Sequence, residues 1–404
     1  MIPLLVVAAA ALAWALTHRR LKSLAVTGPM LMVAVGLVVG WVAGRDVDGF
    51  FDSSGALQTT EIILALLLFI NATQLRGPLR AQLSGPAIRL LAIALPLTLI
   101  LITAAGVLLP MELSVGVVLI IACIAAPADY SKDFVHARGG RVPGRVSRWL
   151  SIEGGYNDGL LSPVLLVAIT LAAPRSGETT HDVAGILLGA IPAILIAIAV
   201  GLGAGALCGV LLKVAYERRW ADVQSTRIGV FALPLLAYAL ATTVHGNGFI
   251  AAFICGIAYR LAQGRHGLPS DTHLVEDMGS FLNLLLWLGF GAAAAVLFSH
   301  SFDWWPAIAL ALIAVTVGRA APVLLALIGS KTTWPDRIYM AAVGPKGPAS
   351  IVFALIAFSM LPREQGFPIL AATAVVMLSS LLLHGIGGPL LTRRLYPTKR
   401  ALAR

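Results

Sequence analysis

The chain has 404 residues, of which 58% are hydrophobic and only 12% charged, too few charges to cover a soluble protein of this size. Its net charge of +10 would suit nucleic-acid binding, but the basic residues lie in short segments between apolar runs, which argues against that function. Apolar runs of about 20 residues recur along the chain, which predicts a polytopic α-helical membrane protein and excludes a β-barrel with its short alternating strands. We expect a single membrane domain over residues 1–404.

The apolar runs predict thirteen transmembrane helices in chain order. They cover about residues 2–16, 27–43, 60–74, 87–109, 112–127, 147–172, 184–213, 226–244, 247–262, 280–299, 305–328, 337–361 and 367–391. No basic residue precedes the first run, whereas Arg19, Arg20 and Lys22 follow it. This order differs from that of a signal peptide and predicts a first helix with its N-terminus outside.

The distribution of lysine and arginine tests this topology. Of the 29 basic residues, 24 fall in segments predicted to lie inside, and only Arg45, Arg175 and Arg363 in segments predicted to lie outside. The remaining two, Arg319 and Lys346, lie within spans. The excess on one side predicts a multi-pass cell-membrane protein with its N-terminus outside and its C-terminus in the cytoplasm.

Two predicted helices are interrupted at membrane depth. The fifth ends in AAPADY at 125–130, and the twelfth contains GPKGP at 344–348. Proline breaks the helical ladder, and the freed backbone groups are tolerated only inside protein or along a cavity. Because these helices are seven apart, they run in opposite directions, as in inverted repeats whose two discontinuous helices cross. The alternative is that glycine and proline are simply frequent in membrane helices.

Ionisable residues in these spans indicate a functional site, because a charge at the bilayer centre costs about 2.5–3.5 kcal/mol or more. Glu153 and Asp158 are five residues apart, so they point to different faces of the sixth helix. We expect Glu153 to pair with Arg319, and Lys346 either to balance Asp129 or to bind freed carbonyls. Asp158 is then left without a fixed partner.

A buried carboxylate regains stability by taking a proton or by coordinating a cation. Asp158, Asp129, the amide of Asn157 and the backbone carbonyl of Ala128 could supply the oxygen ligands that a small cation requires. Competition at one site that opens to each side in turn would give exchange. The alternative is that the sixth helix begins at Glu153 and its acids merely favour the N-terminal dipole.

These motifs resemble those of the NhaP/NHE-type sodium/proton antiporters, a family of the cation:proton antiporter superfamily, from about the third helix to the thirteenth. The matching segments are the E-x-x-x-N-D-G sequence at 153–159, Asp129, GNGFIAAFICG at 246–256, Arg319 with Pro322, and GPKG at 344–347. The resemblance implies a dimeric antiporter fold with a core around 112–172 and 305–391, and the remaining helices as scaffold.

The resemblance also implies the roles of individual residues. Asp158 would carry the ion and the proton, with Asp129 as a further cation ligand and Asn157 beside them. Glu153 and Arg319 would form a structural ion pair. An Asn-Asp pair is typical of the branch thought to be electroneutral. The implied activity is the exchange of Na⁺ or K⁺ for H⁺ by elevator-like alternating access, with a part in pH homeostasis.

The chain departs from the family pattern at several positions. Ala128 stands where the family has Thr, Tyr130 where it has Pro, and Gly154 where it has Ser. Lys346 replaces an Arg, and Asn71 replaces a Glu of the third helix, which makes Asn71 a further site candidate. Fewer side-chain oxygens are therefore expected near the ion than in the family.

Three classes of function compete. The leading hypothesis is a cation/proton antiporter, and the runner-up is a transport-inactive sensor or scaffold, motivated by the hydroxyl groups absent at Ala128 and Gly154. An intramembrane enzyme is not expected, because no Ser/His or His-cluster constellation occurs at matched depth. The cysteines show no ligand spacing, so no cofactor is expected; the expected partners are the lipid bilayer, monovalent cations, protons and a second copy of the chain.

Overall fold

The computed structural model describes residues 2–23, 26–51, 54–74, 85–110, 113–130, 141–173, 183–264, 272–301 and 303–397. Several basic residues of the predicted inner segments, among them Lys132 and Arg138, lie outside these ranges. All regular secondary structure in the described residues is helical, and turns or short extended segments connect the helices. No strand occurs among these residues. The all-α fold class is therefore confirmed.

The first half of the chain runs from the N-terminus to the sixth predicted helix. Its elements are α1 (Ile2–Ser23), α2 (Gly28–Phe51), α3 (Ser54–Gln74), α5 (Pro86–Arg89), the π-helical turn η1 (Leu90–Ala94), α6 (Leu95–Leu108), α7 (Val115–Ala125) and α9 (Gly144–Ala172). α5, η1 and α6 together form the fourth predicted helix, so its interior contains a π-bulge that the apolar pattern did not indicate.

The second half contains the longest helix and the second interrupted one. Its elements are α10 (Val183–Glu217), α11 (Val223–Thr243), α12 (Gly248–Gln263), α13 (His273–Phe298), α14 (Trp304–Val315), α15 (Val317–Ala326), α16 (Trp334–Ala342), α17 (Pro348–Met360), α18 (Arg363–Leu382), the π-helical turn η2 (Leu383–Gly387) and α19 (Gly388–Leu395). Eight helical stretches of the described residues are long and apolar enough to cross a membrane, and four shorter apolar helices accompany them.

The eleventh predicted helix, over 305–328, corresponds to one apolar stretch, Trp304–Ala326, which bends near its middle. Thr316 has φ −110° and ψ −94°, which divides this segment into α14 and α15. Neither proline nor glycine occupies the position. Ala320 N–H donates to the Thr316 carbonyl at 2.8 Å, so α15 starts directly at the bend, and Arg319 lies in its first turn. The exact number of thirteen helices stays a prediction.

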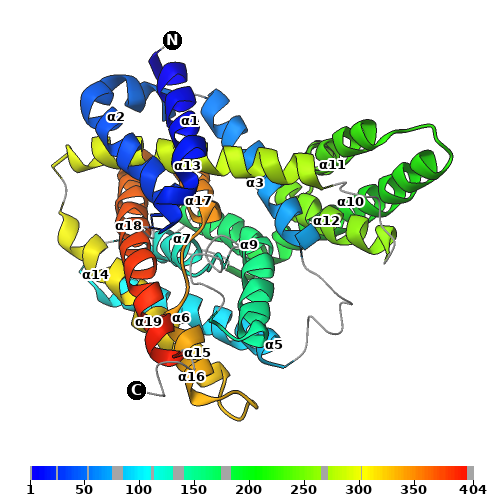
Figure 1. Ribbon diagram of the computed structural model, residues 1–404. Coiled ribbons are helices and arrows are strands. Elements are labelled where there is room, and N and C mark those ends of the chain that lie inside the picture. Colours follow the sequence, from blue (N-terminus) through cyan, green and yellow to red (C-terminus); the bar gives the residue numbers. More distant parts are fainter. Residues whose placement is uncertain are drawn as a thin grey trace.

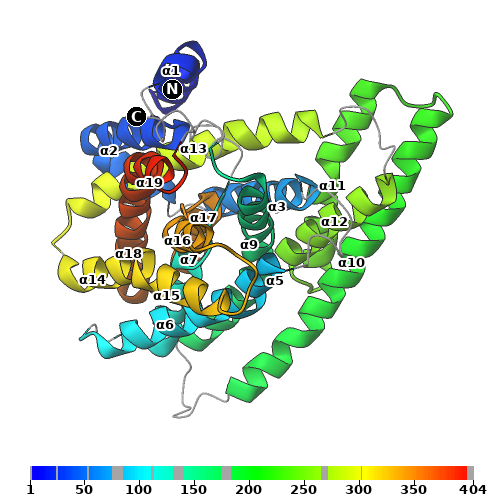
Figure 2. The ribbon, with the colours of Figure 1, turned by 60° about the horizontal axis from the view of Figure 1, so that its bottom comes forward.

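The helices form two groups that α13 connects. α10, α11 and α12 lie together at one edge, and α7, α9, α17 and α18 lie in the other part of the molecule, with α13 running between the two (Figures 1 and 2). α13 also lies along α2, because glycines remove the side chains between them. A Cβ atom at Gly291 would lie 2.5 Å from the carbonyl oxygen of Val33. This close approach makes α2 and α13 one tightly packed unit.

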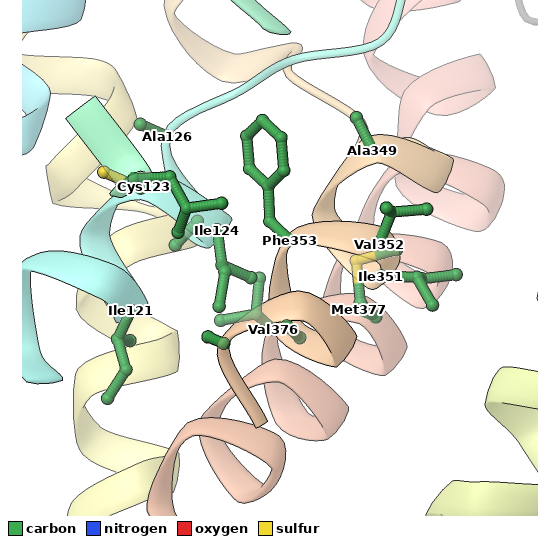
Figure 3. Close-up of a cluster of buried hydrophobic side chains, with 14 of the residues drawn as sticks. Ile121, Cys123, Ile124, Ala126, Ala349, Ile351, Val352, Phe353, Val376 and Met377 are labelled. Carbon is green, nitrogen blue, oxygen red and sulfur yellow. The ribbon is translucent and has the colours of Figure 1, made fainter. Parts of the chain in front are cut away.

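An apolar cluster supports the two interrupted helices beside their breaks. Ile121 and Ile124 of α7 belong to the same buried cluster as Phe353 of α17 and as Val376 and Met377 of α18, and Figure 3 shows Ile124 on the side of α7 toward α17. All five side chains are almost completely buried. The parts of α7 and α17 that adjoin the breaks are thereby held against each other, which places the irregular backbone inside the protein.

Candidate functional site

The two interrupted helices cross at their breaks, as predicted. α7 ends at Ala125, two residues before Pro127, and the backbone then runs extended to residue 130. α16 ends at Ala342, and an extended segment leads to α17, which starts at Pro348. The N–H of Asp129 donates to the carbonyl of Pro345, with 2.7 Å between N and O. The prediction of crossed discontinuous helices is confirmed.

Lys346 satisfies a freed carbonyl group at this crossing. Its Nζ atom donates to the carbonyl oxygen of Pro127 at 3.0 Å, and the residue is only 5% exposed. Of the two roles that the sequence left open for Lys346, the structure shows binding of a freed carbonyl. The ammonium group thus takes the place of the backbone N–H donor that the Pro127 carbonyl would have if α7 continued.

Two residues of α18 and η2 satisfy the freed donors of the other break, and the sequence did not single them out for this. Ser380 Oγ accepts from the N–H of Lys346 at 2.8 Å, and His384 Nε2 accepts from the N–H of Gly344 at 3.2 Å. Both side chains are buried and lie one helical turn apart. The only signal in the sequence is this spacing of two polar residues in an apolar helix.

Asn157 and Asp158 of α9 face the crossing. Asn157 Nδ2 donates to the carbonyl of Ala128 at 2.9 Å. Its Oδ1 atom is buried, and no described residue gives it a hydrogen bond. Asp158 is 7% exposed, and Asn71 Nδ2 of α3 lies 3.5 Å from its Oδ2, at the outer limit of a hydrogen bond. The structure therefore brings Asn71 to the carboxylate that the sequence left without a partner.

Glu153 and Arg319 form a buried bidentate ion pair on another face of α9. Arg319 Nη1 donates to Glu153 Oε1, and Nη2 lies 2.8 Å from Oε2. Nη2 also donates to the carbonyls of Met340 and Val343, both at 3.3 Å. The pair joins α9 to α15 and to the end of α16, where the second break begins.

The charges near Asp158 do not cancel. The Asp129 carboxylate repels the negative charge of Asp158, and the Lys346 ammonium attracts it. Glu153 and Arg319 neutralise each other. Two carboxylates and one ammonium leave one negative charge at the crossing when all three are ionised. No three His, Cys, Asp or Glu side chains gather as a metal site among the described residues, so any cation here would need amide and carbonyl oxygens as well.

A cavity of about 100 Å³ adjoins the crossing on the side of α2 and α13. Asp129, Pro345 and Lys346 line it from the two breaks, and Asn283 and Trp287 line it from α13. Its lining does not include Asp158 or Asn157. The cavity therefore borders the crossing at Asp129, Pro345 and Lys346 and does not extend to Asp158.

Gly154 lies against the extended segment that follows α7. A Cβ atom there would lie 2.8 Å from the carbonyl oxygen of Ala128 and 3.1 Å from the N atom of Tyr130. The missing hydroxyl at this position thus has a steric explanation, since glycine lets the irregular backbone rest directly on α9.

We expect Gly154→Ala to lower the free energy of unfolding by about 1–3 kcal/mol, the usual cost of overpacking a core. The matched control is Gly144→Ala at the start of the same helix, where a Cβ atom would meet nothing within 4 Å. Thermal unfolding of the two purified variants checks this. Equal stability would show that the extended segment moves aside at little cost.

A second polar cluster joins helix ends outside the membrane-spanning segments. Arg145 Nη2 donates to the buried Asp336 carboxylate at 2.8 Å, and the hydroxyl of Tyr396 donates to its other oxygen at 2.9 Å. Burial, followed by the hydrogen bond to Asp336, raises the pKa of Tyr396. The cluster connects the starts of α9 and α16 to the end of α19.

Comparisons with known proteins match most of the chain. Residues 6–394 match the family model described as sodium/hydrogen exchanger, transmembrane. A "K(+)/H(+) antiporter NhaP" of Alkalimonas amylolytica is 27% identical over 345 residues, which cover 81% of this chain but 56% of that relative. A "Na(+)/H(+) antiporter" of Schizosaccharomyces pombe is 25% identical over 401 residues, covering 90% of this chain and 84% of that one. The chain thus spans only about half of the first relative.

The fold has a solved counterpart. The sodium proton antiporter MjNhaP1 of Methanocaldococcus jannaschii superimposes with a TM-score of 0.76 at 19% identity, covering 98% of this chain and all of that one. At this identity the likeness concerns the fold, and it agrees with the crossing of α7 and the α16–α17 segment.

Proposed function

The chain belongs to the transmembrane sodium/hydrogen exchanger family, and from this premise we propose that it is a secondary active antiporter that exchanges a monovalent cation, Na⁺ or K⁺, for H⁺. The relatives named for such exchange support the proposal. Apart from proton transfer to and from a carboxylate, ion exchange changes no covalent bond, so the proposed activity calls for neither an enzymatic reaction nor a cofactor.

The observation that carries the proposal is that two carboxylates, Asp158 and Asp129, and one ammonium, Lys346, lie together at the helix crossing, so that their charges sum to one negative charge when all three are ionised. Asp158, Asp129 and Lys346 leave one negative charge, which either one proton or one monovalent cation neutralises. Since both bind the same oxygens, binding one displaces the other. Exchange of one for one moves no net charge, so we propose an electroneutral cycle in which proton and cation compete at Asp158.

The ligands of the cation are proposed from the geometry of the crossing. Asp158 and Asp129 would contribute carboxylate oxygens, and Asn157 its Oδ1 atom, which accepts no hydrogen bond from the described residues. The Ala128 carbonyl accepts from Asn157 and keeps a second lone pair for the ion. Asn71, whose Nδ2 lies near Asp158 Oδ2, would contribute its amide oxygen as a further ligand.

The charged residues around these ligands would hold the site in place. We propose that Lys346 compensates the break in α7 and that Glu153 and Arg319 form a structural pair rather than part of the ion path. The core would consist of residues around 112–172 and 305–391, and the other helices would form the scaffold and a homodimer contact. Access would alternate by movement of the core relative to this scaffold.

We propose that the protein lies in the cell membrane with its N-terminus outside and its C-terminus in the cytoplasm, as the basic residues predict. The cavity beside Asp129 then opens toward the cytoplasm, because Thr27 at the start of α2 and His384 near the end of α18 both line it. The conformation of this structure would be the inward-facing one.

The test of this function is cation-dependent dissipation of a pH gradient in proteoliposomes, with Li⁺, Na⁺, K⁺ and Rb⁺ supplied in turn. We expect dissipation with Na⁺ or K⁺ and no dependence on membrane potential. Silence with every cation, from protein shown to be folded, would favour the alternative of a transport-inactive sensor or scaffold. That alternative has lost one of its two motives, since packing explains Gly154.

A further inference from the structure

Glycines hold the scaffold helices together by contacts between backbones. A Cβ atom at Gly256 of α12 would lie 2.7 Å from the carbonyl oxygen of Phe69 in α3. One at Gly201 of α10 would lie 2.6 Å from the carbonyl oxygen of Ala251 in α12. The backbone of a helix cannot turn aside, so contacts of this kind fix α3, α10 and α12 relative to one another, as they fix α2 and α13.

The core is joined internally in the same way. A Cβ atom at Gly116 of α7 would lie 2.5 Å from the backbone N atom of Ala172 in α9. Gly154 of α9 rests on the backbone of the extended segment after α7, where its Cβ atom would lie 2.8 Å from the carbonyl oxygen of Ala128. Core and scaffold are thus each tied together through their backbones.

Two glycines of the core that face the scaffold meet side chains instead. A Cβ atom at Gly159 of α9 would lie 2.7–2.9 Å from three ring atoms of Phe253 in α12. One at Gly385 of η2 would overlap the terminal methyl group of Met30 in α2. Phe253 is 5% exposed, and its ring also meets that of Tyr156 edge-on, with 5.7 Å between the centroids. Side chains can yield by rotation, and that of methionine is especially adaptable.

Other features of this boundary leave the core free to move. The cavity of about 100 Å³ lies on it, with Trp287 of the scaffold on one side and Asp129 and His384 of the core on the other. The hydrogen bond from Asn71 of the scaffold to Asp158 of the core spans 3.5 Å, the outer limit for such a bond. Small sliding movements of packed helices are a common form of conformational change, and they require contacts that can be exchanged.

We propose that Gly159 and Gly385 are sliding contacts, at which the core passes Phe253 and Met30 of the scaffold when access alternates. The smooth surface of a glycine lets the ring and the methyl group move along it. A methyl group added at either position would interlock with them and hold the core in place. The volume at these positions therefore limits the rate of exchange and not the affinity for the cation. This role in exchange rests on the proposed function, but the movement itself does not.

The first measurement is the rate of exchange in proteoliposomes. Gly159→Ala should reduce the maximal rate about 10-fold or more, because the added methyl group overpacks a contact that must slide. In a Phe253→Ala background the same change should have no further effect, since the ring that the methyl group meets is gone. The cation concentration that half-protects the purified protein from thermal unfolding should not change. An equal loss of rate with and without Phe253 contradicts the proposal.

The second contact is tested independently. Gly385→Ala should slow exchange in the wild-type background and not in a Met30→Ala background. The matched controls are Gly144→Ala on α9 and Gly387→Ala on η2, where a Cβ atom would meet nothing within 4 Å. Both should exchange ions at the wild-type rate. A loss in the controls as large as that in Gly159→Ala and Gly385→Ala would assign the effect to helix flexibility and overturn the proposal.

The movement is measured without transport, as the distance between spin labels on the scaffold and on the core. Gln224 of α11 and Arg394 of α19 are both exposed and can carry the labels, once the three native cysteines are replaced by alanine. We expect two distances whose proportions differ between acidic and alkaline pH, and in Gly159→Ala one distance at both. Two distances in a protein that exchanges no ions, with one in Gly159→Ala, would support the sliding contacts while the proposed function fails. A single distance in the labelled parent protein, or unchanged proportions in Gly159→Ala, overturns the proposal.

Discussion

Asp158→Asn is expected to reduce cation-dependent proton flux at least about 100-fold, because the amide neither takes up a proton nor offers a negative charge to a cation. The change is nearly isosteric and removes a carboxylate that is only 7% exposed. We therefore expect the protein to fold, with a thermal stability equal to or higher than that of the wild type. Dissipation of a pH gradient in proteoliposomes is the measurement.

The control for this prediction is Asp303→Asn, the same chemical change at an exposed position. Asp303 caps α14 by accepting from the N–H of Trp305, and asparagine caps helices about as well as aspartate. Its exchange should equal that of the wild type. Exchange retained in Asp158→Asn would refute the carrier role of Asp158, whereas loss in both variants would indicate damage unrelated to the site.

Glu153→Gln should destabilise the protein more than either Gly154→Ala or Asp158→Asn. It leaves Arg319, 5% exposed, with two carbonyl acceptors at 3.3 Å but no counter-ion. Removing one partner of a buried ion pair costs about 3–5 kcal/mol, because the remaining charge is buried uncompensated. The melting temperature of the purified protein should therefore fall well below that of Asp158→Asn.

Removal of both charges separates this explanation from simple loss of packing. Glu153→Leu combined with Arg319→Leu should regain part of the stability, since no isolated charge remains, although Met340 and Val343 lose a donor. Equal melting temperatures for Glu153→Gln and Asp158→Asn would contradict a structural ion pair. A double variant less stable than Glu153→Gln would assign the effect to packing.

The sequence predicted most of this fold because apolar runs and basic segments report directly on membrane insertion. The interrupted helices were also predictable, since Pro127, Pro345 and Pro348 prevent a continuous ladder. The bend at Thr316 was not, because neither this residue nor its immediate neighbours are proline or glycine, and only contacts across the fold distinguish the position. The N-terminal ends of α3 and α13 extend beyond their apolar runs for a related reason, since polar residues continue a helix once it has started.

The site was predictable in its charged residues and not in its geometry. An isolated charge within a membrane span costs free energy, so the sequence predicted that Glu153 and Arg319 pair with each other. The structure brings the two side chains together. The contacts of Ser380 and His384 with the broken backbone depend on how α18 lies beside it, which no local pattern expresses. The orientation of Asn157, whose Nδ2 donates to a carbonyl while Oδ1 has no donor among the described residues, is likewise a property of the packed crossing.

The bond between Lys346 and the Pro127 carbonyl joins residues 219 positions apart in the chain. A nascent chain that has inserted α7 and α9 therefore holds its irregular backbone without this partner until α16 and α17 have been synthesised. Contacts of such sequence separation form late and slowly. Until then the Pro127 carbonyl lacks its Lys346 partner, and a polar backbone group without a partner is unfavourable in a membrane. We therefore expect that misassembly and degradation of the nascent protein occur mainly before the two interrupted helices have come together.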